Sequence, residues 1–251
     1  MVRISHLVTV EPVRRRWVEQ ALLSLYELAQ ETHAEEGQVL LPNGRAVPDV
    51  LLVEGRHLAP GAVYESADDS ARLRLTVRHW DRRSTLRFEQ ILSDEELVMA
   101  AQGALRSIDR PREAELRGSV HSPGRWPSLR RAEGGARVDL DAWWKATTAR
   151  RFSGAPLTAT LRHRLGEATV RVTPRRCEDG RWEVRAVLTL RGRSLVRPLA
   201  AVGLRLFRRS LERAFAQALD DMARQWNETV PDVVAQDVSR LREEILNAVA
   251  E

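Results

Sequence analysis

The chain has 251 residues, of which 43% are hydrophobic and 30% are charged, with 14 Gly, 11 Pro and a single Cys. This composition is typical of a globular protein, and it excludes a disordered chain, a collagen-like repeat and a disulfide-rich scaffold. The 40 basic and 35 acidic residues give a formal net charge of +5, too small an excess to indicate nucleic-acid binding by itself. The length allows one large domain or two small ones.

Residues 3–10 alternate weakly between polar and apolar and predict a first strand. Glu11-Pro12 predicts the start of a long helix, because proline is favoured at the first helical position. Apolar residues then recur at spacings of three and four, as on a helix that covers a core. They are Val13, Trp17, Val18, Ala21, Leu22, Leu25 and Leu28.

The next segments follow the two-residue period of strands. Asn43-Gly44 predicts a hairpin turn between residues 39–41 and 50–53. Residues 71–90 alternate between Leu, Val or Phe and Arg, which predicts a second antiparallel hairpin. The spacing of Ser93 and Glu96 matches a capping box, so we expect a helix over residues 94–108.

The region 109–135 is rich in Pro, Arg, Ser and Gly and indicates a boundary or a long excursion, with a possible strand at 114–120. A short helix at 140–151 and strands at 157–165, 169–173 and 182–191 are expected after it. The two halves resemble each other, so a tandem duplication is one alternative to a single domain. We expect an N-terminal unit (1–110), a C-terminal unit (111–230) that could be continuous with it, and a terminal helix (231–251).

The strongest amphipathic pattern runs from 196 to about 227 and predicts a long helix. Pro231-Asp232 predicts the start of a last helix, which could pack on the body or bind a second subunit or protein partner. Residues 1–6 lack the apolar stretch of a secretory signal, and no apolar run is long enough to span a bilayer. A lone Cys177 fits a reducing compartment, so we expect a cytoplasmic protein.

The strand at 182–196 passes through Arg197-Pro198-Leu199 into the helix 203–226, and this arrangement resembles the C-terminal part of the START-like helix-grip superfamily, which includes polyketide cyclases and lipid-transfer proteins. Residues 8–17 are similar to that superfamily's first strand and helix. The resemblance implies an α+β fold in which a curved antiparallel sheet grips the long C-terminal helix. It also implies an apolar cavity between them that binds a lipid- or polyketide-like molecule.

Several residues are candidates to line this cavity. A neutral histidine inside it could orient a ligand or act as a base, although a hydrogen-bonded structural histidine is the simpler interpretation. Tryptophans could line it or simply anchor the core. The candidates are His79, His163, Trp143, Trp182, Phe207, Leu211 and Phe215. No constellation of catalytic residues is evident, and whether the protein is an enzyme stays open.

The sequence contains no Gly-rich phosphate loop and no clustered His or Cys residues, so we expect no cofactor and no metal. A rival hypothesis is an Arg-rich sheet surface, carrying an aromatic residue, that binds nucleic acid or another polyanion. Its candidates are Arg72, Arg74, Arg78, Trp80, Arg162 and Arg164. Glu89 and Glu183 interrupt that surface. A third hypothesis is a non-catalytic scaffold that assembles through residues 232–251.

Overall fold

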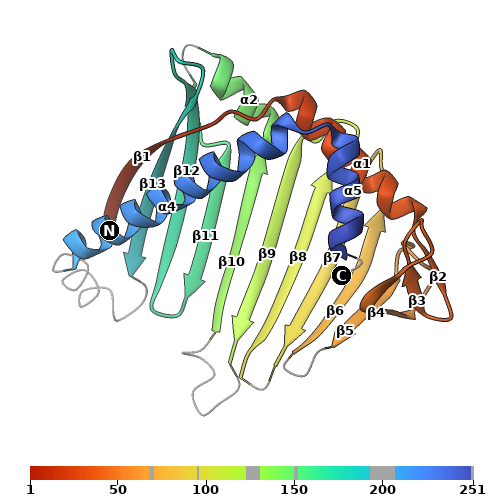
Figure 1. Cartoon of the computed structure of the whole chain (residues 1–251). Coiled ribbons are helices and arrows are strands. Elements are labelled where there is room, and N and C mark those ends of the chain that lie inside the picture. Colours follow the sequence, from red (N-terminus) through yellow and green to blue (C-terminus); the bar gives the residue numbers. More distant parts are fainter. Residues whose placement is uncertain (68–70, 95, 123–130, 150–151, 193–206, 250–251) are drawn as a thin grey trace.

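A single antiparallel sheet with helices on one side makes up the computed structural model, which describes residues 1–67, 71–94, 96–122, 131–149, 152–192 and 207–249 (Figure 1). The fold is α+β, with a curved sheet and a long C-terminal helix, which confirms the predicted fold class. The strands are β1 (Val2–Val10), β2 (His33–Glu35), β3 (Gln38–Leu40), β4 (Ala46–Glu54), β5 (Val63–Ala67), β6 (Arg72–Trp80), β7 (Thr85–Ser93), β8 (Val98–Arg106), β9 (Glu113–His121), β10 (Arg131–Asp139), β11 (Leu157–His163), β12 (Gly166–Arg176) and β13 (Trp182–Gly192). The helices are α1 (Arg15–Glu31), α2 (Leu140–Thr148), α4 (Arg208–Ala235) and α5 (Val238–Val249).

The strand order is β1-β13-β12-β11-β10-β9-β8-β7-β6-β5-β4-β3-β2. The first strand of the chain therefore pairs with the last, and from β2 to β13 each strand pairs with the next one in the sequence. The predicted boundary at residues 110 and 111 lies in the connection between β8 and β9. These two strands pair directly, so the sheet is continuous there.

The strand register sorts the side chains onto two sides. Directly paired residues share a side, and successive residues of a strand alternate between sides. One row across the sheet places Val170 between Ala159 and Leu188, whereas the next row places Thr169 between Thr160 and Thr189. The apolar rows face the helices and the polar rows form the opposite surface, which we call the outer side.

Two separate hydrophobic clusters hold the helices to the sheet. The first lies at the β1 end, where Ala223 of α4 packs with Val10, Trp182 and Val184, and Trp143 of α2 joins them. The second lies near the other end, where Val39, Ala62, Tyr64 and Val77 are buried. Trp80 packs against this second cluster and stacks on Tyr26 of α1, with 5.4 Å between the ring centroids. The strands between the two clusters, β7 to β11, contribute no residue to either cluster in the described part of the chain.

Two side chains of α4 hold the segment between β1 and α1. The Asn227 side chain accepts a hydrogen bond from the backbone N–H of Glu11 at 2.8 Å and donates one to the carbonyl oxygen of Thr9 at 3.0 Å. Trp226 donates to the Glu11 carbonyl at 2.9 Å. Because α4 binds the backbone of Thr9 and Glu11, this segment stays extended. Helix α1 begins at Arg15 rather than at Pro12, the predicted first residue.

The predicted helix at 94–108 is wrong, because residues 98–106 form strand β8. The Asp94 carboxylate accepts hydrogen bonds from the N–H groups of Glu96 and Leu97, both at 2.7 Å. The Asp94 N–H in turn donates to the Leu97 carbonyl at 3.0 Å. The polar residues that predicted a helix cap therefore close the turn of the β7–β8 hairpin.

The predicted break at Pro231 is also wrong, because α4 continues through this residue to Ala235. The interruption comes at Asp237, whose carboxylate accepts a hydrogen bond from the Ser239 N–H at 3.1 Å and so begins α5. Helix α5 packs back on α1, where Arg242 forms an ion pair with Glu31 (Figure 1). In the described part of the chain, none of the helices has both the length and the apolar character needed to cross a membrane.

Candidate functional site

The helix-facing side of β7 to β11 is almost entirely apolar, and we call it the central surface. Over these described strands only two of its side chains are polar, Gln90 on β7 and His163 on β11. Its members are Leu86, Phe88, Gln90, Leu92, Met99, Ala101, Gly103, Leu105, Ala114, Leu116, Gly118, Val120, Ala132, Gly134, Ala136, Val138, Leu157, Ala159, Leu161 and His163.

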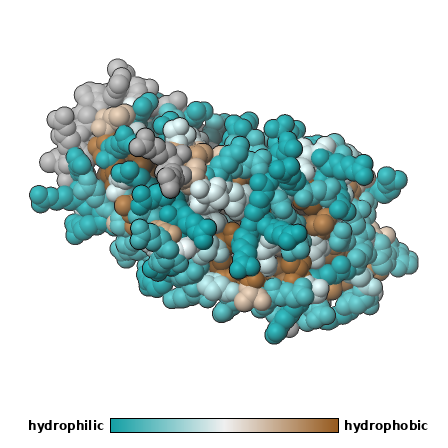
Figure 2. Space-filling view, turned by 90° about the horizontal axis from the view of Figure 1, so that it is seen from above, coloured by the Kyte–Doolittle hydropathy of each residue, from teal (hydrophilic) through white to brown (hydrophobic). Residues whose placement is uncertain are grey.

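Large side chains of the central surface remain open to solvent. The exposed fraction is 38% for both Phe88 and Met99, 51% for Leu116 and 53% for Leu161. Helix α4 makes its main sheet contacts with β1, and α5 packs on α1, so neither helix is centred on these strands. Viewed from above, hydrophilic residues cover most of the molecule and hydrophobic residues appear between them (Figure 2). Exposed apolar side chains gathered on neighbouring strands of one side of a sheet are a common mark of a binding site.

Small residues shape the floor of the central surface. A Cβ atom on Gly103 would lie 2.2 Å from the Phe88 ring, so the glycine leaves the space in which this ring lies against β8. The neighbouring row holds Ala101, Gly118 and Gly134, which pair in register across three strands. Small side chains therefore lie next to larger ones such as Leu116, which makes this surface uneven.

The predicted cavity residues are distributed over several places. Trp143 and Trp182 meet edge to face, with 6.0 Å between ring centroids, inside the cluster at the β1 end. Trp182 is only 7% exposed, which fits a core anchor. Phe207 precedes α4 and is 65% exposed, while Leu211 and Phe215 are half-buried on that helix.

His163 lies on the central surface, as its strand pattern predicts. Its Nδ1 accepts a hydrogen bond from the Leu165 N–H at 3.3 Å in the β11–β12 turn. It pairs with Ala132 on β10 and Gly166 on β12, at one edge of the apolar area. Of the two predicted histidines, it is the one that the fold places beside exposed apolar side chains.

The sides predicted for His79 and Trp80 are reversed in the structure. The register of β6 against β7 shifts between Val77 and His79, so Arg78 is an extra, bulged residue. His79 therefore lies on the outer side opposite Arg87 and contacts the Ser84 hydroxyl at 3.0 Å. Trp80 turns toward α1 and does not share a side with Arg72 and Arg74, as the polyanion hypothesis required.

Carboxylates lie beside the arginines of the outer side. Arg78 contacts Glu89 at 2.5 Å, and Arg74 contacts Glu54 and Glu65 at 3.3 and 3.5 Å. Arg162 lies 3.5 Å from Glu167. Arg72 is exposed on the same side, and Arg164 lies in the β11–β12 turn. Local pairing removes much of the attraction that such a surface would have for a nucleic-acid backbone.

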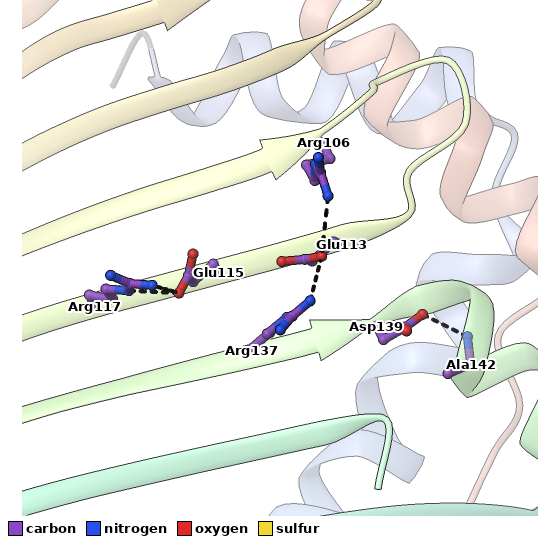
Figure 3. Close-up of polar contacts among 7 residues, drawn as sticks. All are labelled: Arg106, Glu113, Glu115, Arg117, Arg137, Asp139 and Ala142. Atoms are coloured by element: carbon purple, nitrogen blue, oxygen red, sulfur yellow. Dashed lines mark hydrogen bonds and ion pairs between the residues drawn. The ribbon is translucent and has the colours of Figure 1, made fainter. Parts of the chain in front are cut away.

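A groove of about 970 Å³ lies on the outer side of β8 to β11. Glu113 accepts from Arg137 at 2.9 Å and lies 3.7 Å from Arg106, while Glu115 pairs with Arg117 at 2.5 Å (Figure 3). The bond to Glu113 raises the pKa of Arg137, which stays protonated. The groove is lined by the outer-side residues Ala100, Gln102, Glu115, Arg117, Ser119, Arg131, Glu133, Gly135, Arg137, Thr158, Thr160 and Arg162. Its lining also includes Leu116, Gly118, Gly134 and Ala136, which alternate with these residues along β9 and β10 and belong to the central surface.

Among the described residues, no group of three or more His, Cys, Asp or Glu side chains is arranged to hold a metal ion. His57, outside both surfaces, contacts Tyr64 and Thr32 rather than a carboxylate or a cysteine. The central surface offers apolar contacts to a ligand, and the outer side offers hydrogen bonds and charges.

No family model matches this chain, and no curated protein matches it. One of the solved structures that match is that of DynU16, a protein in the dynemicin biosynthetic locus. The two chains are 12% identical, the match covers 74% of this chain and 86% of DynU16, and the TM-score is 0.21. A TM-score of this size does not establish a common fold, so the functional proposals rest on this chain's own residues.

Proposed function

We propose that this protein binds a small apolar molecule, lipid- or polyketide-like, on the central surface. The observation that carries the proposal is the gap between the two hydrophobic clusters, across which Leu116 and Leu161 stay half exposed. Four strand spacings separate β7 from β11, so the gap is about 19 Å wide along the sheet. This width suits a ligand of several rings or a folded acyl chain.

The free energy available on this surface is adequate for such binding. Covering about 200 Å² of apolar surface contributes about 5 kcal/mol, from which the cost of immobilising the ligand is subtracted. Gln90 on β7 and His163 at the edge of the apolar area supply hydrogen-bonding groups for polar atoms of the ligand. The sequence pattern of residues 182–226, which resembles the helix-grip superfamily, implies the same class of ligand.

A neutral fluorescent probe, N-phenyl-1-naphthylamine, tests the proposal by titration. We expect the probe to bind the wild-type chain and Leu116→Glu to weaken binding at least tenfold, because the new carboxylate would have to lose water beside the ligand. Ile91→Glu is the matched control, since Ile91 is 46% exposed and lies on the outer side of β7. Equal weakening by both substitutions, or no binding by the wild type, would contradict the proposal.

The observations favour this function over polyanion binding. The polyanion hypothesis draws on the arginines of the outer side, but Trp80 packs against the core and Arg74, Arg78 and Arg162 each lie beside a carboxylate. Strong, salt-sensitive retention on heparin that is lost on substitution of Arg72 would reverse this preference. Assembly through residues 232–251 stays a prediction, tested by the oligomeric state after their removal.

A further inference from the structure

The groove on the outer side of the sheet is a second surface, and twelve of its sixteen lining residues lie on the side opposite the central surface. Directly paired residues give it an ordered floor of three rows over β8 to β11. The middle row is Gln102, Arg117, Gly135 and Thr160; one neighbouring row is Ala104, Glu115, Arg137 and Thr158; the other is Ala100, Ser119, Glu133 and Arg162.

Gly135 leaves a recess at the centre of these rows. Arg117 and Thr160 bound it across the strands, at spacings of about 4.8 Å, and Glu133 and Arg137 bound it along β10, at about 7 Å. The recess therefore has a hydroxyl group, two guanidinium groups and a carboxylate around one small floor. Such a set offers hydrogen-bond donors and acceptors together.

The charges of the groove favour a ligand that carries few negative charges. Its lining holds four arginines and two glutamates, a formal charge of +2. Glu113 and Glu167, which pair with Arg137 and Arg162, add two negative charges beside it. Counted with Arg106, which lies 3.7 Å from Glu113, the groove and its rim hold five guanidinium groups and four carboxylates. The anionic groups of a polyphosphate would therefore lie close to carboxylates, whereas a molecule with a single negative charge can lie beside one guanidinium group.

Free hydrogen-bonding positions remain on the paired side chains. Within the described part of the chain, both contacts of Arg117 go to Oε1 of Glu115, and Arg131 contacts Oε1 of Glu133. Oε2 of each glutamate can therefore accept a hydrogen bond from a ligand. Arg137 donates to Glu113 through Nη2, and the other nitrogen atoms of its guanidinium group also carry N–H donors. Hydroxyl groups suit this pattern, because each can donate to a carboxylate and accept from a guanidinium group.

Arg162 is the least engaged guanidinium group of the groove. Its Nε lies 3.5 Å from Glu167, longer than a normal hydrogen bond, and its side chain is 58% exposed. The other three arginines approach their carboxylates to 2.9 Å or less. A ligand carboxylate would therefore form its strongest additional ion pair in the groove with Arg162.

We propose that this groove binds a sugar acid, a hydroxyl-rich molecule that carries a single carboxylate, with the carboxylate at Arg162 and ring hydroxyls over Gly135 between Thr160 and Arg117. The site lies on the opposite side of the sheet from the apolar ligand. Both sites can therefore be occupied together, and either proposal can fail without the other.

Solution NMR titrations of the full chain with glucuronate and glucose test the site. We expect both sugars to shift the amide signals of Gly135 and Thr160, with glucuronate binding about fivefold more tightly because of one exposed charge pair. Arg162→Gln removes this preference. Arg106→Gln is the matched control and keeps it, since Arg106 lies on the same side outside the groove.

A second pair of variants tests the hydroxyl contacts without altering charge. Thr160→Val keeps the side-chain shape and is expected to weaken both sugars about threefold, whereas Thr169→Val, next in the same row but outside the groove, leaves both unchanged. The proposal is overturned if neither sugar shifts these signals, if Arg162→Gln leaves the preference intact, or if N-phenyl-1-naphthylamine displaces glucuronate. Loss of probe binding alone would count only against the apolar site.

Discussion

At the scale of single residues, His57 lies in a chain of hydrogen bonds that ties the loop after β4 to the end of α1. The Thr32 hydroxyl donates to the Ala29 carbonyl at 2.6 Å, so it accepts from Nε2 of His57 at 2.8 Å. Nδ1 of His57 then accepts from the Tyr64 hydroxyl at 2.9 Å, and Tyr64 accepts from the Leu58 N–H at 2.8 Å. Every group in this chain is satisfied only while the imidazole is neutral.

We predict that, because of this network, the free energy of unfolding falls in mild acid. Burial, and secondly the nearby His33, lowers the pKa of His57 below its ordinary value of about 6.5. Between these two pKa values the unfolded chain binds more protons, so this contribution is present above about pH 6.5 and is lost as the pH falls through the folded-state pKa.

Urea unfolding at pH 7.5 and pH 5.5 measures the effect. We expect His57→Gln to be less stable than the wild type at pH 7.5 and to lose less stability on acidification. His121→Gln, at an exposed position of β9, should retain the wild-type response. An unchanged pH response in His57→Gln would argue against this role.

Residue alternation predicted the sides of β6 correctly up to Val77 and wrongly beyond it. The bulge at Arg78 inserts one residue into the pairing with β7, which exchanges the sides of His79 and Trp80. Nothing in the residue types marks this insertion, because a bulge depends on how two strands pair. Two candidate binding residues were therefore assigned to the wrong side.

At the scale of elements, Asn227 and Trp226 hold α4 against the end of β1. We predict that Asn227→Ala lowers the free energy of unfolding by about 1–3 kcal/mol, because it removes two hydrogen bonds and leaves the partly buried Glu11 N–H without its partner. Gln225→Ala, at an exposed position of the same helix, should change it by less than about 0.5 kcal/mol. Urea denaturation compares the two, and equal effects would show that these bonds do not anchor the helix.

Elements with a strong period were predictable. The hairpins at 39–53 and 71–90 and the helix containing Trp143 were expected from local pattern, and all three are present. Strand β8 was missed, since Ser93 and Glu96 match a helix cap. Its helix-facing residues, Met99, Ala101, Gly103 and Leu105, include two small ones and no β-branched or aromatic side chain that would mark a strand. The exposed member Met99 was missed for the same reason.

At the scale of the whole molecule, the sheet is wider than its helices can cover. Thirteen strands follow one another, while the buried clusters lie toward the two ends. The pairing of β1 with β13 joins residues more than 170 positions apart, which no local pattern reveals. The central surface depends on that arrangement, and so its residues could not be grouped from the sequence.

The most direct test of the central claim is to locate an apolar ligand on the folded chain. Methyl NMR spectra with a nitroxide-labelled fatty acid report which methyl groups lie near it. We predict broadening of the Met99, Leu116 and Leu161 methyl signals, with the outer-side methyl groups of Ile91 and Leu7 unaffected. Broadening confined to the outer side, or none at saturating ligand, would contradict the account.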